Sequence, residues 1–120
     1  AENGKEKTYY LRTDGKGKIG ETRNWDHKNA DSKGNEQSIN LPWNTLSMEV
    51  GGNRYSVQRI SQTNVPQPER FSERDYGRFG SYFVAEVTKE KPLEVDYRYI
   101  IKAGEMDVEE CEANAKAYRK

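Results

Sequence analysis

Two short alternating segments around a glycine pair are the feature that most constrains how this chain can fold. Residues 46–50 alternate apolar with polar side chains, and residues 55–59 set Tyr, Val and Arg in alternation with Ser and Gln. Between them, residues 51–53 read Gly-Gly-Asn, which is typical of the tight turn that joins two antiparallel strands. Because successive side chains of a strand point to opposite faces, each segment offers one face to a core. The pattern predicts a β-hairpin.

The composition favours a thin, sheet-based core over a helical bundle. Only 19 of the 120 residues are Ile, Leu, Val or Phe, whereas the chain has eight tyrosines and two tryptophans. A tyrosine buries a large ring and keeps a polar tip, which suits a thin sandwich. Disorder would require a high net charge as well, and the formal net charge is +0. We expect a mainly β fold: an antiparallel β-sandwich, or half of a larger one, with one short C-terminal helix.

The other elements are expected from local patterns. Residues 8–12 predict a short strand, and residues 13–40, which are rich in Gly, Asp, Asn, Lys and Ser, predict a long loop. Residues 82–88 and 93–102 predict a second hairpin, in which the odd-numbered residues of the later segment, from Leu93 to Ile101, form the core face. After Gly104, Asp107 can cap a helix whose apolar residues recur at helical spacing.

These elements predict one domain in two parts. Residues 1–40 form a polar N-terminal strand and a long loop, and residues 41–120 form the hairpins and the C-terminal helix. A structureless stretch as long as 13–40 is uncommon in a compact domain, so it is either functional or packs on something that this chain lacks. We therefore expect a fragment of a larger domain, which forms a homo-oligomer or pairs with a missing segment.

Charge and cysteine content exclude several classes of function. Residues 1–60 carry a formal charge of +2 and residues 61–120 a charge of −2. Neither half has the strong positive potential that would attract nucleic acid. The single cysteine, Cys111, excludes an internal disulfide, and the lack of a run of about 18 apolar residues excludes a membrane-spanning helix. The polar, lysine-rich start at Ala1 is typical of a processed, exported protein. We expect a soluble protein in the periplasm or outside the cell.

Residues 70–80 combine arginines, carboxylates and aromatic rings in a way that suits recognition. Their guanidinium groups can bind carboxylate, sulfate or phosphate in a bidentate manner, and their rings can stack on a sugar. The predicted ligand-binding residues of this run are Arg70, Arg74, Tyr76 and Arg78. The ligand would be an acidic or neutral saccharide. In the structural alternative, Ser72 and Asp75 form a capping box for one helical turn, and the glycines only turn the chain.

Glu73 and Asp75 are candidates for a catalytic pair. Glycoside hydrolysis needs two carboxylates held roughly 5–10 Å apart across the scissile bond, and the spacing of these two residues allows this. The neighbouring arginines would hold at least one carboxylate ionised, which suits a base or a structural anchor better than a proton donor.

Trp25, His27 and Trp43 form a further candidate site. The two indole rings could provide a sugar-binding platform, with His27 as a proton carrier or a single metal ligand. In the alternative interpretation, each tryptophan closes the edge of the core and His27 is a solvated loop residue. We expect no cofactor and no metal ligand set, with calcium as the alternative because Asp14, Asp26 and several asparagines crowd the loop.

Several motifs resemble those of a known family. They are Leu-Pro-Trp at 41–43, Leu-Ser at 46–47, Gly-Gly-x-Arg-Tyr at 51–55, Arg-Phe-Ser-Glu-Arg-Asp-Tyr-Gly-Arg-Phe-Gly-Ser-Tyr-Phe at 70–83, Lys-Pro-Leu at 91–93, Tyr-Arg at 97–98 and Gly-Glu-Met at 104–106. Over residues 41–115 this series resembles the C-terminal portion of the bacterial PmoA-like family, also labelled methane oxygenase. The resemblance implies a mostly β protein more than twice this length, often similar to secreted proteins of bacteria that degrade polysaccharides.

Methane oxidation itself is excluded on chemical grounds. Copper oxygenase chemistry needs several imidazole ligands, and this chain has one histidine and no apolar span. Three function classes remain: a saccharide-binding module or accessory to polysaccharide use, a glycoside hydrolase-like enzyme that uses a carboxylate pair, and a structural or assembly domain without a small ligand. We favour the first.

Overall fold

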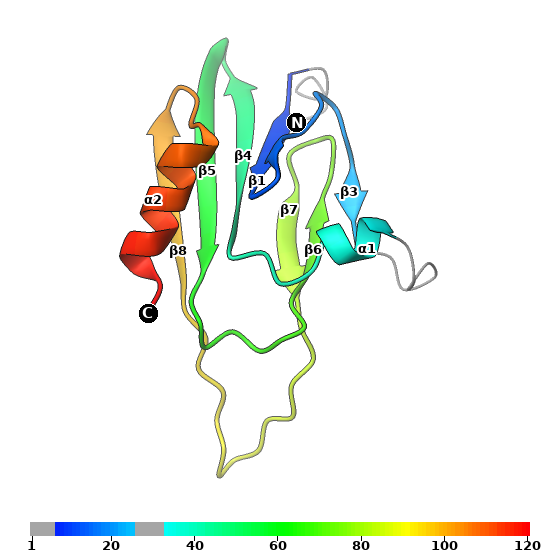
Figure 1. The fold of residues 1–120 in the computed structure, drawn as a ribbon, viewed down its shortest axis with the longest axis vertical. Helices are drawn as coiled ribbons and strands as arrows, with labels where there is room; N and C mark the ends of the chain where they lie inside the picture. The colour runs from blue at the N-terminus through cyan, green and yellow to red at the C-terminus, as the bar shows by residue number, and fades with distance from the viewer. Residues whose placement is uncertain (1–6, 26–32) are drawn as a thin grey trace.

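The protein is mainly β and contains two antiparallel sheets and two short helices. The structure, a computed structural model, describes residues 7–25 and 33–120. The larger sheet has five strands in the order β2-β1-β4-β5-β8 and the smaller has three in the order β3-β6-β7 (Figure 1). The bounds of the larger sheet are β1 Tyr9–Arg12, β2 Gly15–Lys16, β4 Trp43–Val50, β5 Asn53–Ser61 and β8 Tyr97–Ala103. Those of the other elements are β3 Arg23–Asn24, β6 Arg70–Glu73, β7 Phe79–Tyr82, α1 Lys33–Gln37 and α2 Val108–Tyr118.

The central hairpin confirms the prediction from the alternating segments. Strands β4 and β5 pair in one register, from Trp43 opposite Ile60 to Val50 opposite Asn53. Gly51 and Gly52 make the turn with φ angles of 60° and 83°, in the left-handed region that favours glycine. This hairpin forms the middle of the larger sheet.

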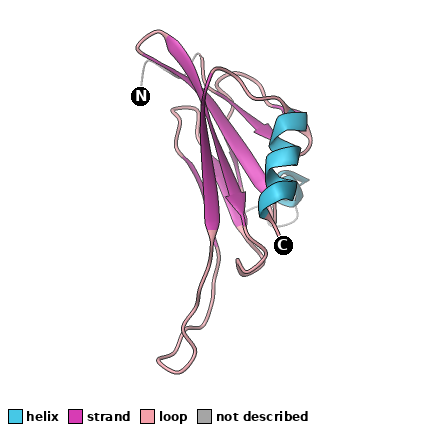
Figure 2. Ribbon diagram, turned by 90° about the vertical axis from the view of Figure 1, so that its left-hand side faces the viewer, coloured by secondary structure: helices cyan, strands magenta, loops and turns pink. Residues whose placement is uncertain are grey.

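Helix α2 covers one face of the larger sheet, as Figure 2 shows. Its N-cap is Asp107, whose side chain accepts a hydrogen bond from the Glu110 N–H at 2.8 Å, which confirms the predicted cap. The buried Cys111 and Ala115 of the helix pack in the core cluster. The remaining buried members of this cluster are Tyr9, Leu11, Trp43, Ile60 and Met106. The smaller sheet packs on the opposite face, to which alternation directs Tyr10, Arg12 and Asn44.

The long-loop prediction for residues 13–40 is wrong in part. The segment contains β2, β3 and α1. Strand β2 extends β1 as a hairpin partner, and β3 joins the smaller sheet by pairing with β6. Strands of two residues carry too little periodicity to be recognised, because they exist only through their partners.

The predicted second hairpin is also wrong. Strand β7 pairs with β6, strand β8 pairs with β5, and residues 83–96 lie between them as a loop that projects beyond both sheets (Figure 1). The core face of β8 is reversed as well: Ile100 packs against the core cluster, while Tyr99 and Ile101 are 57% and 73% exposed. The reason is that Ile100 lies opposite Gln58, and Gln58 donates a hydrogen bond to the Cys111 carbonyl of α2. The even-numbered face of β8 is therefore the one that the helix covers.

No helix within the described part of the chain has the length and apolar character needed to cross a membrane.

Candidate functional site

The run from Arg70 to Gly80 forms the β6–β7 hairpin of the smaller sheet. Its register places Arg70 opposite Tyr82 and Glu73 opposite Phe79. No helical turn occurs here, so the capping-box alternative is wrong; Ser72 Oγ instead donates to Asn24 Oδ1 at 2.7 Å. Strand alternation turns Phe71 and Glu73 toward the larger sheet and leaves Arg70 and Ser72 on the outer face.

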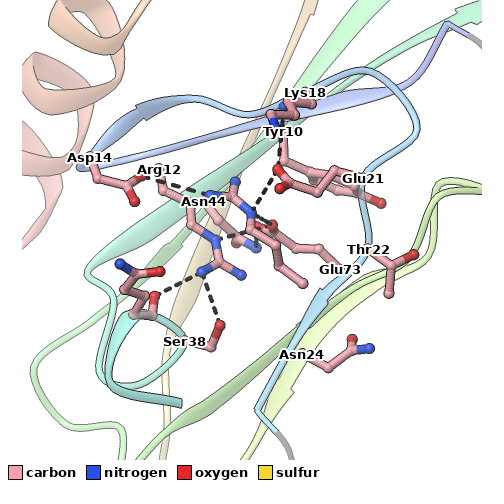
Figure 3. A network of polar contacts seen from close by, with 12 residues as sticks. Tyr10, Arg12, Asp14, Lys18, Glu21, Thr22, Asn24, Ser38, Asn44 and Glu73 are labelled. Carbon is pink, nitrogen blue, oxygen red and sulfur yellow. Dashed lines mark hydrogen bonds and ion pairs between the residues drawn. The ribbon is translucent and has the colours of Figure 1, made fainter. Parts of the chain in front are cut away.

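The inner side of this hairpin holds a buried ionic network, drawn in Figure 3. Glu73 has no exposed surface, and its Oε1 lies 3.0 Å from Arg12 Nε and 3.3 Å from Arg23 Nε. Its Oε2 accepts a hydrogen bond from Asn44 Nδ2 at 2.9 Å. The fully buried Arg12 also donates through Nη1 to the Ser38 hydroxyl at 3.0 Å. These contacts fasten the smaller sheet to strands β1 and β4.

This network corrects the catalytic prediction for Glu73. A carboxylate without exposed surface, held by two guanidinium groups and an amide, cannot contact a substrate in this arrangement. Asp75 lies in the turn after β6, where its backbone N–H donates to Thr22 Oγ1 at 3.1 Å. Thus Glu73 faces the interior and Asp75 belongs to the surface turn, so the fold does not assemble the two as an accessible pair.

A cavity of about 200 Å³ adjoins the network, lined by Arg12, Thr22, Arg23, Asn24, Gln37 and Ser38. Arg12 Nη2 and Arg23 Nη2 have no hydrogen-bond partner among the described residues. The carboxylates of Glu21 and Asp14 also lie 3.5 and 3.8 Å from Arg23. Three carboxylates therefore surround two guanidinium groups, and this local excess of negative charge disfavours an anion site.

The turn after β6 is held by a buried tyrosine of β1. The Tyr10 hydroxyl donates to the Arg74 carbonyl at 2.7 Å and lies 3.2 Å from the Arg78 carbonyl. Burial raises the pKa of Tyr10, and the carboxylate of Glu73 adds to the shift. The phenol therefore stays a proton donor, and it fixes the backbone from which the exposed Arg74 and Arg78 side chains project.

The outer face of the smaller sheet gathers two aromatic rings around one arginine. The Arg70 guanidinium carbon lies 4.5 Å from the Trp25 ring centroid and 5.8 Å from that of Tyr82. The two rings meet edge to face, with centroids 6.4 Å apart. Arg70 Nε is buried and has no hydrogen-bond partner among the described residues. Cation–π contact holds the guanidinium plane in place without neutralising its charge.

A shallow groove of about 230 Å³ adjoins the cluster formed by Arg70, Trp25 and Tyr82. It is lined by Ser72, Arg78, Phe79, Gly80, Ser81 and Tyr82. Gly80 forms part of its floor, and a Cβ added there would meet no atom within 4 Å. Tyr82 belongs both to the groove and to the cluster with Arg70 and Trp25, so it connects the two. Of the groove residues, Ser72 and Tyr82 belong to the outer face of the sheet, whereas Phe79 and Ser81 lie opposite the inward-facing Glu73 and Phe71.

The structure brings some of the predicted ligand-binding residues together and separates others. Trp25 and Arg70 are in contact, and Arg78 lines the neighbouring groove. Arg74 and Tyr76 lie in the exposed turn between β6 and β7. His27 lies outside the described residues.

The prediction that Trp43 forms part of a sugar-binding platform is wrong. Its side chain is 0% exposed, and it packs in the core cluster beneath α2. No face of the ring is open to a sugar, so the core alternative holds for this tryptophan. It is buried because the even-numbered face of β5, which includes its pair partner Ile60, points toward the helix.

The calcium alternative has no support in residues 7–25 and 33–120. In this part of the chain, no group of three or more His, Cys, Asp or Glu side chains could hold a metal ion. Asp14 contacts Arg23 instead, and Asp26 and Asp31 lie outside the described residues.

Tyr82 and Asn24 are the surface residues that sequence reasoning missed. The sequence pattern places Tyr82 in the predicted hairpin of residues 82–88 and 93–102. Its position opposite Arg70 follows only from the β6–β7 register. The available signal was the alternation of residues 79–82 as a partner for 70–73 across a turn that contains Gly77, whose φ is 91°.

Comparisons with known proteins give no match: no family model, no curated protein and no solved structure matches this chain. The resemblance to the PmoA-like family stays a prediction that depends on the motifs quoted above.

Proposed function

We propose that this protein binds an acidic saccharide on the outer face of the three-stranded sheet. The observation that carries the proposal is Arg70, whose guanidinium group lies near the rings of both Trp25 and Tyr82 and whose Nε is unpartnered among the described residues. Aromatic rings stack on the apolar faces of sugars, and a guanidinium group binds carboxylate or sulfate in a bidentate manner. The adjoining groove of about 230 Å³ would take a neighbouring sugar unit.

The charges on this surface favour an acidic ligand over a neutral one. In the described part of the chain, no ion pair involves Arg70, Arg74 or Arg78. The other arginines of the hairpin region, Arg12 and Arg23, are by contrast compensated by carboxylates. Three guanidinium groups that form no ion pair with any described residue, on one sheet and its turn, favour uronate or sulfate groups.

The enzyme alternative has less support. Its proposed carboxylate Glu73 is buried in ion pairs and faces the opposite side of the sheet from the groove. The binding proposal agrees with a periplasmic or extracellular location, where polysaccharides are met, and this location stays a prediction.

The proposal is tested by calorimetric titration of the purified chain with three probes: oligogalacturonate, chondroitin sulfate oligosaccharide and a neutral cello-oligosaccharide. We expect binding of a charged probe and none of the neutral one. Arg70→Met removes the charge but keeps the stem, and should weaken binding by about 10- to 100-fold, because a charge-assisted hydrogen bond contributes about 1.5–3 kcal/mol. Gly80→Val should fill the groove without a clash in the fold, since the space at its Cβ is open.

The matched control is Arg98→Met. Arg98 also stacks on an aromatic ring, with its guanidinium carbon 4.5 Å from the Tyr118 centroid, but it lies on the helix side of the larger sheet. Its replacement should leave binding unchanged. A charged probe that binds equally well to Arg70→Met and Gly80→Val would contradict the site, and preference for the neutral probe would contradict the ligand class.

A further inference from the structure

Strand β8 leaves one edge of the larger sheet open. It is the last strand in the order β2-β1-β4-β5-β8, and within the described residues it pairs only with β5. An open edge presents a row of backbone N–H and C=O groups that another strand can pair with, and natural proteins cover or charge such edges. Here the edge is seven residues long and carries the exposed side chains of Tyr99 and Ile101.

The hydrogen bonds at the two ends of the β5–β8 ladder determine which backbone groups face outward. The Gln62 N–H donates to the Asp96 carbonyl at 3.0 Å, and the Gly104 N–H donates to the Arg54 carbonyl at 2.8 Å. The register between these ends is constant, so the even-numbered residues of β8 bond to β5. The N–H and C=O groups of the odd-numbered residues Tyr97, Tyr99 and Ile101 therefore point to the open edge.

Charged side chains follow the even-numbered positions of the same strand. Arg98 stacks on Tyr118 and Lys102 Nζ lies 2.8 Å from Glu110 Oε1, which places both on the helix side. Asp96 precedes them and accepts a hydrogen bond from Asn64 Nδ2 at 2.9 Å. An acidic residue thus lies directly before the strand, and a basic residue lies one position before its end.

We propose that β8 pairs antiparallel with β8 of a second copy of this chain, with the two-fold axis at Tyr99. In this register Asp96 of each copy lies opposite Lys102 of the other. Tyr97 lies opposite Ile101, and Arg98 lies opposite Ile100. The pairs made by Tyr97, Tyr99 and Ile101 each exchange two backbone hydrogen bonds, because all three residues point their backbone groups outward.

The register follows from the outward groups and the charges. Odd-numbered residues must oppose odd-numbered residues, which excludes every register with the two-fold axis between two residues. An axis at Arg98 would set Arg98 against its own copy, and an axis at Ile100 would set Arg98 against Lys102, and like charges directly opposite are destabilising. An axis at Tyr97 would require residues 91–96 to extend the strand, and the structure assigns none of them to a strand. An axis at Ile101 would set Lys102 against Ile100 and Arg98 against Gly104, so that neither basic residue would lie opposite Asp96. The axis at Tyr99 is the one that sets Asp96 against Lys102.

A second copy is the occupant that this edge fits, because the strand complements itself. Asp96, directly before the strand, lies opposite Lys102 of the other copy on one face of the joined sheet, and aromatic and aliphatic side chains meet on the other face. This proposal is independent of saccharide binding, since the outer face of the smaller sheet stays open.

Cysteine cross-linking tests the register. Residues in a hydrogen-bonded antiparallel pair have Cα atoms about 5.5 Å apart, within the range of a disulfide. Tyr99→Cys should therefore give a covalent dimer on mild oxidation, while Ile101→Cys and Val50→Cys should not, because neither lies opposite its own copy. The native Cys111 does not interfere, since it is fully buried.

Sedimentation velocity tests the assembly itself. The wild-type chain should reach twice its 13.9 kDa mass with increasing concentration. Ile101→Asp introduces two charges into the dimer, one in each copy, and should weaken it by about 100-fold. Val50→Asp, at an apolar position that is 54% exposed and lies at the far turn, should not. A monomer at every concentration, or a dimer that survives Ile101→Asp and is not cross-linked at residue 99, would overturn the proposal.

Discussion

Replacing Glu73 by Gln tests the reassignment of this residue from a catalytic carboxylate to a structural one. Glu73 and Arg12 are both fully buried and lie 3.0 Å apart, and Arg23 shares the same carboxylate oxygen. Loss of one partner leaves a buried charge uncompensated, which costs about 3–5 kcal/mol of unfolding free energy. For a domain of this size, this corresponds to a fall of about 10–25 °C in the melting temperature.

The measurement is urea unfolding followed by tryptophan fluorescence, because Trp43 is completely buried and reports on the core. A mutant cycle of Arg12→Met, Glu73→Leu and the double variant isolates the pair. The two single changes should together cost about 2 kcal/mol more than the double change, since the double variant leaves neither charge unpaired.

The control is Lys7→Met, which removes one partner of a surface ion pair whose side chains are 58% and 28% exposed. Such a surface pair contributes about 0–1 kcal/mol, because solvent screens it. A structural role of Glu73 is contradicted if Glu73→Gln lowers the free energy of unfolding no more than this control does. Additive effects of the Arg12 and Glu73 changes would contradict it as well. A catalytic Glu73 would show the opposite behaviour, with stability kept and turnover lost.

Two further predictions concern the surroundings of this network. Because the pKa of Tyr10 is raised from its ordinary value of 10.0, the folded state retains a proton that the unfolded chain loses, so stability should fall as pH rises above about 10. Tyr10→Phe should flatten this fall between pH 8 and pH 11 in urea unfolding and cost about 1 kcal/mol at neutral pH; an unchanged slope would exclude Tyr10 as its source. Gly17→Ala should cost about 1–2 kcal/mol, because its Cβ would lie 3.0 Å from Arg23 Nη2 and 3.2 Å from the Tyr10 carbonyl oxygen. Gly80→Ala, which meets no atom within 4 Å, should stay within about 0.5 kcal/mol of the wild type, and equal effects of the two alanines would contradict the crowding at Gly17.

The candidate site was predictable in its location but not in its composition. The arginine and aromatic content of residues 70–80 indicated the hairpin on which the candidate site is proposed, and Arg70, Arg78 and Trp25 lie on or beside one outer surface. Tyr82 joins them only through the β6–β7 register. The local sequence cannot show that Glu73 is buried, because its ion-pair partner Arg12 lies 61 residues earlier in the chain.

Elements with local signals can be predicted from the residues alone. The β4–β5 hairpin follows from alternation around two glycines, and helix α2 follows from Asp107 and its capping hydrogen bond to the Glu110 N–H. Such signals lie within a few residues of one another, so they need no partner to be recognised.

Which face of each strand is buried depends on the packing of distant elements. In β8 the apolar odd-numbered residues looked like the core face, yet α2 covers the even-numbered face and leaves Tyr99 and Ile101 in solvent. The two faces of a strand have equal geometry. Helix α2 packs on the face of β8 that includes Ile100, because Gln58, the β5 residue opposite Ile100, donates a hydrogen bond to the α2 backbone. The pairing of β8 with β5 rather than with residues 82–88 likewise depends on contacts between distant segments, which alternation within one strand cannot specify.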